Sequence, residues 1–156
     1  MSTFAQIHGN LVRQWKGFLL LESLLEEEFS LLRENDTESV SVLEFSIHEL
    51  LRQLAVERAD MRAIMQGTRA AEYAGLLPEE EGGEMKKLLS AIDEAEQRCA
   101  RQASHNTELS LALLDQSHSL MSYLHKNIQP KQEVVYGAKG VYREHHLGAT
   151  LYSGRL

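Results

Sequence analysis

Seven histidines, two runs of three glutamates and a single cysteine are the side chains of this sequence that could bind a metal or catalyse a reaction. His118 and His125 are seven residues apart and would share one face of a helix. Two histidines without a matching set of cysteines or carboxylates are far from a zinc site. The neighbouring His145 and His146 point in different directions and are expected to be solvated. The pattern predicts no metal site and no cofactor.

The other reactive groups also favour structural roles. Cys99 falls on an apolar seam without an evident activating neighbour, so we expect a small buried hydrophobic side chain. The glutamates at 79–81 are expected to begin a helix, and those at 26–28 to lie on a solvated helix face. Gly137 and Gly140 do not form a phosphate-binding loop, because no strand precedes them and no Lys-Ser/Thr pair follows. We therefore expect no enzymatic activity.

Composition and charge predict a small all-α protein. The 156 residues fit one domain, aromatic residues make up only 6%, and Pro78 and Pro130 are the only prolines. Residues 1–128 carry 12 basic and 21 acidic side chains, and residues 129–156 carry 4 and 2. Such an acidic body repels phosphate backbones, so nucleic acid is not an expected partner. No apolar run could span a bilayer and no signal peptide is evident, which predicts a cytoplasmic protein without stable membrane insertion.

Apolar residues recur at helical spacing in three segments, expected at about 3–33, 37–72 and 84–128. The repeats are Phe4, Leu11, Phe18, Leu25 and Leu32 in the first, Val40, Leu43, Ile47, Leu50, Leu54, Met61 and Ile64 in the second, and Met85, Leu88, Ile92, Ala95 and Cys99 in the third. The polar cluster after Arg33 predicts a tight turn, with Asp36 or Thr37 capping the second helix. Residues 73–83, with Pro78 and three glycines, predict a loop.

These elements predict an antiparallel helical hairpin and a long third helix that together form a coiled-coil-like bundle over residues 1–128, followed by a flexible tail at 129–156. Gly9 and Gly17 are expected to weaken the first helix and make its start irregular. Gln102 and Asn106 occupy seam positions of the third helix, where a polar residue either fixes the register or marks loose packing.

The end of the third helix carries more apolar surface than one partner helix can cover. Its seam continues with Leu109, Leu113, Leu120 and Leu124, and a second stripe contains Leu111, Leu114, Met121 and Ile128. Periodicity leaves several interpretations open. The helix folds back on the hairpin, a second copy covers the stripe in a homodimer or coiled-coil scaffold, or the stripe docks a partner's amphipathic segment. Trp15 likewise predicts core or groove packing, with partner contact as the alternative.

Three stretches resemble the FlgN family of flagellar export chaperones. LLLESLLEEEFSLLRENDTESVSVLEFSIHELLRQLAVER resembles the family's Leu/Glu-rich opening hairpin with its central Asp turn, and HNTELSLALLDQSHSLMSYLHK resembles its last helix. VVYGAKG is similar to the family's Tyr-Gly-Ala-x-Gly element, which follows that helix. The chain departs from the family at Phe45-Ser-Ile-His48, where members often carry Glu-Lys.

The resemblance implies a non-enzymatic chaperone that binds the C-terminal helical segment of the hook-filament junction proteins FlgK and FlgL, prevents premature assembly and delivers them to the flagellar type III export gate. It also implies that Tyr136, with Gly137 and Gly140, docks on the gate component FlhA. Combined with the apolar pattern, it places the substrate groove at Leu109, Leu113, Leu120, Met121, Leu124 and Ile128.

Overall fold

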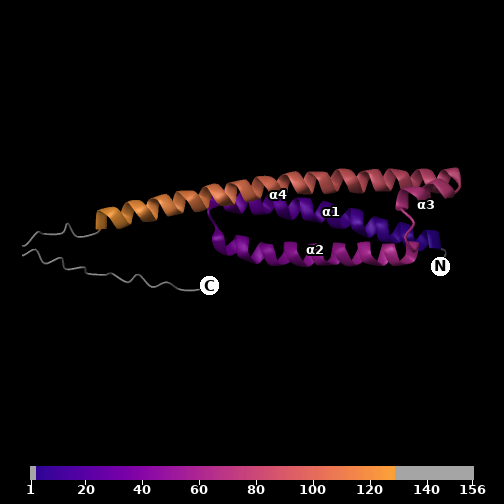
Figure 1. Ribbon diagram of the computed structural model, residues 1–156, viewed down its shortest axis with the longest axis horizontal. Coiled ribbons are helices and arrows are strands. Elements are labelled where there is room, and N and C mark those ends of the chain that lie inside the picture. The colour runs from indigo at the N-terminus through magenta and orange to yellow at the C-terminus, as the bar shows by residue number, and fades with distance from the viewer. Residues whose placement is uncertain (1–2, 129–156) are drawn as a thin grey trace, which may run out of the picture. The chain divides into compact units, whose positions relative to one another are not determined.

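The computed structural model describes residues 3–128, which form four helices, and residues 1–2 and 129–156 lie outside its description (Figure 1). In chain order these are α1 (Thr3–Glu34), α2 (Thr37–Met65), α3 (Ala70–Leu76) and α4 (Glu79–Ile128). The predicted all-α fold class is confirmed. The chain divides into two compact units, Met1–Ser117 and His118–Leu156. The first unit contains α1, α2, α3 and most of α4. The predicted flexible tail falls outside the described residues.

A two-residue turn, Asn35 and Asp36, joins α1 and α2 into the predicted hairpin. Asn35 adopts the left-handed conformation (φ 57°). The backbone N–H groups of Asn35 and Asp36 then donate to the carbonyls of Leu32 and Leu31, each at 3.1 Å, which closes the end of α1. The carboxylate of Asp36 caps α2 by accepting hydrogen bonds from the backbone N–H (3.1 Å) and hydroxyl (2.7 Å) of Ser39. Of the two predicted caps, Asp36 and Thr37, the structure confirms Asp36.

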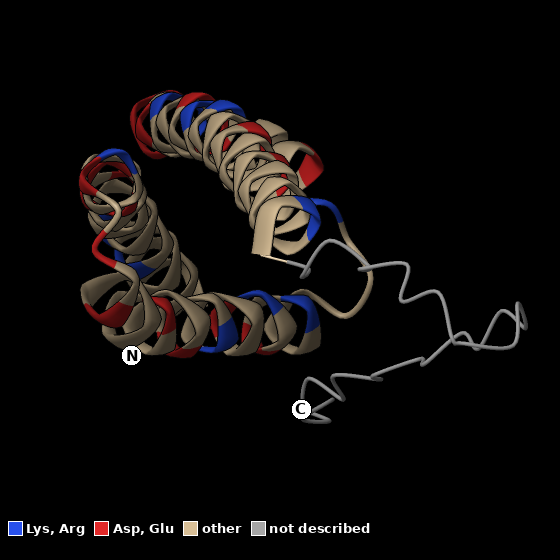
Figure 2. Ribbon diagram, turned by 90° about the vertical axis from the view of Figure 1, so that its left-hand side faces the viewer, with Lys and Arg blue, Asp and Glu red and all other residues tan. Residues whose placement is uncertain are grey.

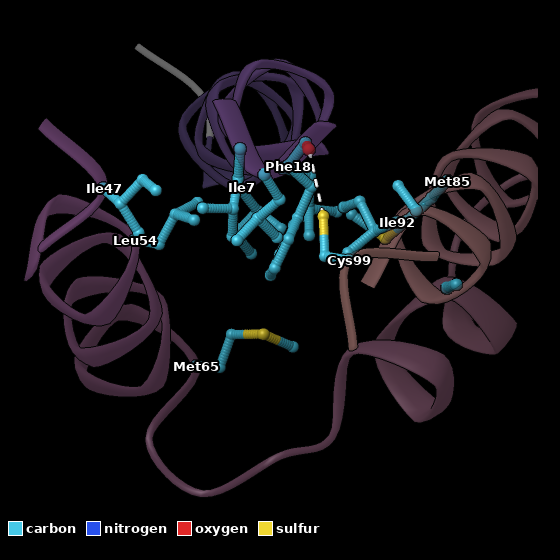
Figure 3. Packing of buried hydrophobic residues seen from close by; sticks show 13 residues of the cluster. Ile7, Phe18, Ile47, Leu54, Met65, Met85, Ile92 and Cys99 are labelled. Atoms are coloured by element: carbon cyan, nitrogen blue, oxygen red, sulfur yellow. Dashed lines mark hydrogen bonds between the residues drawn. The ribbon is translucent and has the colours of Figure 1, made fainter. Parts of the chain in front are cut away.

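The predicted apolar seams of the three long helices meet in one core (Figure 3). Its buried members are Ile7, Leu11, Phe18, Leu21 and Leu25 of α1, Ile47, Leu54 and Met65 of α2, Ala74 of α3, and Met85, Ile92, Ala95 and Cys99 of α4. In the close-up, the side chains of α2 and α4 approach α1 from its two sides. Each long helix therefore buries one stripe, and α1 is the element that both others cover.

The glycines of α1 do not interrupt it. The helix is continuous from Thr3 to Glu34, so the predicted irregular start is wrong. A Cβ atom at Gly17 would lie 2.7 Å from Cδ2 of the buried Leu54, so this glycine lets α2 pack close to the α1 backbone. The helix-propensity cost of a glycine, roughly 1 kcal/mol, is thus offset here by closer packing.

The connection between α2 and α4 differs from the expected one. Helix α2 ends at Met65 instead of residue 72, because Gln66 (φ 49°) and Gly67 (φ 91°) both adopt left-handed conformations. The short helix α3 follows at Ala70–Leu76, and α4 already begins at Glu79 rather than at 84. The predicted loop over residues 73–83 is therefore wrong for most of its length.

Pro78 and Gly82, which suggested a loop in the sequence, are compatible with the start of α4. Pro78 directly precedes the first turn, where a missing N–H costs nothing, and the three following glutamates complement the positive end of the helix dipole. Gly82 is buried, and a Cβ atom there would lie 2.5 Å from the carbonyl oxygen of Ala74 in α3. The missing side chain at Gly82 therefore allows α3 to rest directly on α4.

Polar contacts join the helices beside the core. Asn10 is only 1% exposed, and its Nδ2 donates to the carbonyl (2.8 Å) and Oε2 (2.6 Å) of Glu57 on α2. Its Oδ1 accepts from Nε2 of the buried Gln14 at 2.6 Å. Arg13 also pairs with Glu57, with Nε and Oε1 2.6 Å apart. This cluster, which the sequence patterns did not indicate, fixes α1 against α2 because a buried amide left unpaired would be costly.

Candidate partner-binding surface

Asn106 marks the place where α4 stops being buried. It is 4% exposed, and its Nδ2 donates to the carbonyl oxygen of Leu25 (2.8 Å) and to Oε2 of Glu28 (2.5 Å) on α1. Its Oδ1 accepts from Nε2 of Gln102 at 3.0 Å. All polar atoms of this amide are therefore engaged, so the two polar seam positions fix the register and do not loosen the packing.

Burial falls steeply along α4 after this amide. Leu109 and Leu113 are half-buried within the first unit, and every described residue from Leu114 to Ile128 is exposed. On the second stripe, Leu111 is 58% exposed and Leu114 51%. Apolar side chains of this size stay open to solvent only at an energetic cost of about 25 cal/mol per Å². The apolar surplus expected at the end of this helix is therefore present.

The described part of the second unit, residues 118–128, is helical and carries four predicted groove residues. Leu120, Met121, Leu124 and Ile128 are 57%, 62%, 39% and 72% exposed. Their positions i, i+1, i+4 and i+8 place them on one face of the helix. The structure thus gathers these four on a common exposed face and leaves Leu109 and Leu113 partly covered in the first unit. Their role in binding stays a prediction.

A cavity of about 310 Å³ lies in the first unit, between the hairpin turn and α4. Its apolar lining comes from Leu31, Leu32 and Val40 of the hairpin and from Leu113 and Leu114 of α4. Asn35, Asp36, Thr37, Ser41, Ser110 and Ser117 complete the lining. We call this cavity the tip notch. The sequence patterns indicated the α4 side of this cavity but missed the hairpin side. Apolar residues on both sides of the tight turn are the sequence signal that could have indicated it.

A second exposed apolar group, also missed, lies on α2. Phe45 is 79% exposed and Val42, one turn away, is 65% exposed. Phe45 belongs to the tetrapeptide Phe45-Ser-Ile-His48, which departs from the pattern of the family that the sequence resembles. It lines neither the tip notch nor the face formed by residues 120–128. Phe45 is therefore a suitable position for a control substitution.

The potentially reactive side chains have structural surroundings. Cys99 is 4% exposed, and its Sγ donates to the carbonyl oxygen of Phe18 at 3.3 Å. Burial raises the pKa of the Cys99 thiol to about 11, which opposes formation of a nucleophilic thiolate. The prediction of a buried structural cysteine is confirmed. Trp15 is half-buried against the core, as its default interpretation predicted. Among residues 3–128, no three His, Cys, Asp or Glu side chains are grouped to hold a metal ion.

Three predicted site residues, Tyr136, Gly137 and Gly140, lie outside the described residues, so their role in gate docking stays a prediction. None of the described helices is long and apolar enough to cross a membrane.

These features define a class of all-α proteins in which a helical hairpin packs against one long helix and leaves an apolar face of that helix open. The family model described as FlgN protein matches residues 1–144. The chain therefore belongs to the FlgN family of flagellar export chaperones, as the sequence resemblance indicated. Members of this family are chaperones in flagellar assembly and protein export, and not enzymes. Searches of curated proteins and of solved structures gave no match.

Proposed function

We propose that this protein is a cytoplasmic chaperone for the hook-filament junction proteins FlgK and FlgL. It binds their C-terminal helical segment, prevents premature assembly and delivers the complex to the export gate component FlhA. The observation that carries this proposal is the exposed apolar face of α4 at Leu120, Met121, Leu124 and Ile128. Membership of the FlgN family supports a chaperone role in flagellar export, and the exposed face supplies a surface for it.

An amphipathic helix is the occupant that this face fits, because helix-in-groove binding joins apolar faces whose anchors lie three, four and seven residues apart. Met121 lies three residues before Leu124 and seven before Ile128. Fully burying an aliphatic side chain yields about 1.5–3 kcal/mol, and these four side chains are already partly shielded. Ordering the substrate segment and losing translational freedom consume several kcal/mol of that gain. The resulting affinity is moderate, which suits a partner that must be released at the gate.

Substitution of Leu120 tests the groove. Leu120→Glu places a charge in the proposed contact and should weaken binding of a FlgK C-terminal peptide by at least about tenfold, since an unpaired buried charge is costly. Phe45→Glu introduces the same charge at an exposed apolar position of α2 and should bind like the unmodified protein. Isothermal titration calorimetry measures both. Equal binding by the two variants would show that the groove lies elsewhere, and no binding by the unmodified protein would refute the proposed substrate.

We further propose that Tyr136 contacts FlhA, with Gly137 and Gly140 leaving it accessible. The support is the Tyr-Gly-Ala-x-Gly motif, together with the large apolar ring and single hydroxyl that make tyrosine a common contact residue. Tyr136→Ala should leave FlgK peptide binding unchanged and weaken binding of the chaperone–substrate complex to the cytoplasmic domain of FlhA. Tyr142→Ala changes another tyrosine of the same segment and serves as the control. Docking unaffected by Tyr136→Ala would remove this residue from the gate contact.

A further inference from the structure

We infer that the tip notch is a docking site for the partner helix, and that it selects a helix whose apolar anchors are flanked by lysine or arginine. This inference rests on the proposed function and adds the charge class of the substrate segment. Charge is unevenly distributed in the first unit; Figure 2 colours acidic residues red and basic residues blue.

Negative charge is concentrated around the notch. Residues 26–44, which contain the hairpin turn, carry seven acidic side chains and only one basic side chain, Arg33. Residues 106–117 of α4, which include the four lining residues Ser110, Leu113, Leu114 and Ser117, carry two acidic side chains and no basic one. These two segments together have a net charge of −8, whereas all of residues 1–117 have −10. The rest of the unit, with 12 acidic and 10 basic side chains, is nearly balanced.

Among residues 3–128, no ion pair engages a carboxylate of the segment 26–44. The ion pairs between helices in the described part use Glu22, Glu57, Glu84 and Glu96, none of which belongs to the segment 26–44. Glu34 and Glu38 are exposed and flank the lining residues Asn35, Asp36 and Thr37. An uncompensated group of like charges beside a hollow focuses the field there and attracts ligands of opposite charge. The tip notch therefore favours a ligand that carries lysine or arginine beside its apolar anchors.

The lining itself requires an apolar anchor. Leu31, Leu32 and Val40 face Leu113 and Leu114 across a cavity of about 310 Å³, which has room for a large apolar side chain. An apolar floor within an acidic rim matches an amphipathic helix that presents leucine-like anchors and flanking basic residues. An acidic helix with the same anchors would meet like-charge repulsion at the rim. Charge would thus discriminate between segments that share an apolar pattern.

Two synthetic peptides test this selectivity on the full-length protein. Both carry leucines at the same helical spacing, and the flanking residues are lysine and arginine in one and glutamate in the other. Fluorescence anisotropy at 50 mM NaCl should show at least about tenfold tighter binding of the basic peptide, and 500 mM NaCl should shrink the difference to about twofold because salt screens exposed charges. Equal binding of both peptides at low salt would overturn the inference.

Charge substitutions locate the effect. Glu34→Gln combined with Glu38→Gln removes two rim charges and spares the helix cap at Asp36, and should weaken binding of the basic peptide by about threefold to tenfold. Asp60→Asn combined with Glu94→Gln removes the same charge from exposed positions that do not line the notch, and should change binding by less than about twofold. A rim variant that binds like its control would show that the notch does not select charge.

Two further variants separate the possible occupants. Ser110→Trp fills the notch from α4 and should weaken binding of the basic peptide by about tenfold, and unchanged binding would place the helix elsewhere.

Lys131→Gln combined with Lys139→Gln removes positive charge from the chain's own C-terminal residues and should leave binding unchanged. Tighter binding by that variant would identify the protein's own C-terminal segment as the occupant. A FlgK peptide that binds without any of these effects would refute only the charge inference, whereas no binding of the FlgK peptide would refute the proposed function.

Discussion

The adjacent glycines at the start of α4 allow two matched alanine variants to be compared. Gly82 and Gly83 both lie inside the helix, so alanine at either position should add the same helix propensity, about 0.5–1 kcal/mol. Their surroundings differ. A Cβ atom at Gly83 would meet nothing within 4 Å, whereas one at Gly82 would lie 2.5 Å from the carbonyl oxygen of Ala74. Gly83→Ala should therefore stabilise the protein, and Gly82→Ala should destabilise it relative to Gly83→Ala.

The size of the difference follows from the contact. Cβ atoms in real proteins stay at least 3.0 Å from such an oxygen, so α3 would have to move by 0.5 Å or more. The atom in the way belongs to the backbone of a helix whose Ala74 is buried, so no side chain can rotate aside. Overpacking of this kind costs about 1–3 kcal/mol. Because the gain in helix propensity is common to both variants, their free energies of unfolding should differ by this packing cost.

Urea unfolding followed by far-ultraviolet circular dichroism measures the difference. With a slope of about 2 kcal/mol per M, a gap of 2 kcal/mol separates the two midpoints by about 1 M. Gly83→Ala should have its midpoint above that of the unmodified protein. If Gly82→Ala were as stable as Gly83→Ala, the close approach of α3 to α4 would not exist in solution, and the explanation given for this glycine would be wrong.

Three further predictions concern single polar groups. Asn106→Asp should lower the free energy of unfolding by about 1–3 kcal/mol in urea titrations, because the carboxylate cannot donate to Leu25 and faces Glu28. Burial raises the pKa of Cys99 to about 11, so the contribution of this thiol to stability should be fully present below pH 9 and be lost as the pH rises from 9 to 11. Cys99→Ala should remove that part of the slope. Hydrogen bonds from Ser39 lower the pKa of Asp36, so its contribution should be present above the ordinary carboxyl pKa of 3.8 and disappear as the pH falls through its lower folded-state value. Asp36→Ala should accordingly melt at a lower temperature than the unmodified protein at pH 7, and the two melting temperatures should converge in acid.

The seams and the hairpin could be predicted because they depend on local periodicity and local turn chemistry. The heptad positions Leu11, Phe18 and Leu25 are buried, and Asp36 caps α2 where the polar cluster indicated. The path from α2 to α4 could not be predicted in this way. Pro78 and Gly82 are loop signals in sequence, but here one precedes a first turn and the other makes room for a neighbouring helix. Only the tertiary contact between Gly82 and Ala74 shows that this glycine makes room for a helix and does not mark a loop.

The candidate site was predictable on one side only. Helical periodicity placed Leu113 and Leu120 on one face of the third helix, and their partial or full exposure agrees with the expected apolar surplus. The other wall of the notch comes from Leu32 and Val40, about seventy or more residues away in the chain, and helical periodicity does not reveal which turn lies beside which helix. The buried amide of Asn10 was missed for a similar reason, because its partner Glu57 is 47 residues away.

The acidic hairpin turn also affects how copies of this protein meet one another. Exposed apolar helix faces ordinarily favour self-association and aggregation. Two molecules that approached through their notches would each bring a net charge of −8 from residues 26–44 and 106–117, and would repel at low ionic strength. The same carboxylates would therefore oppose self-association through this apolar surface while no partner covers it. Sedimentation at rising salt should show self-association appearing only once this repulsion is screened.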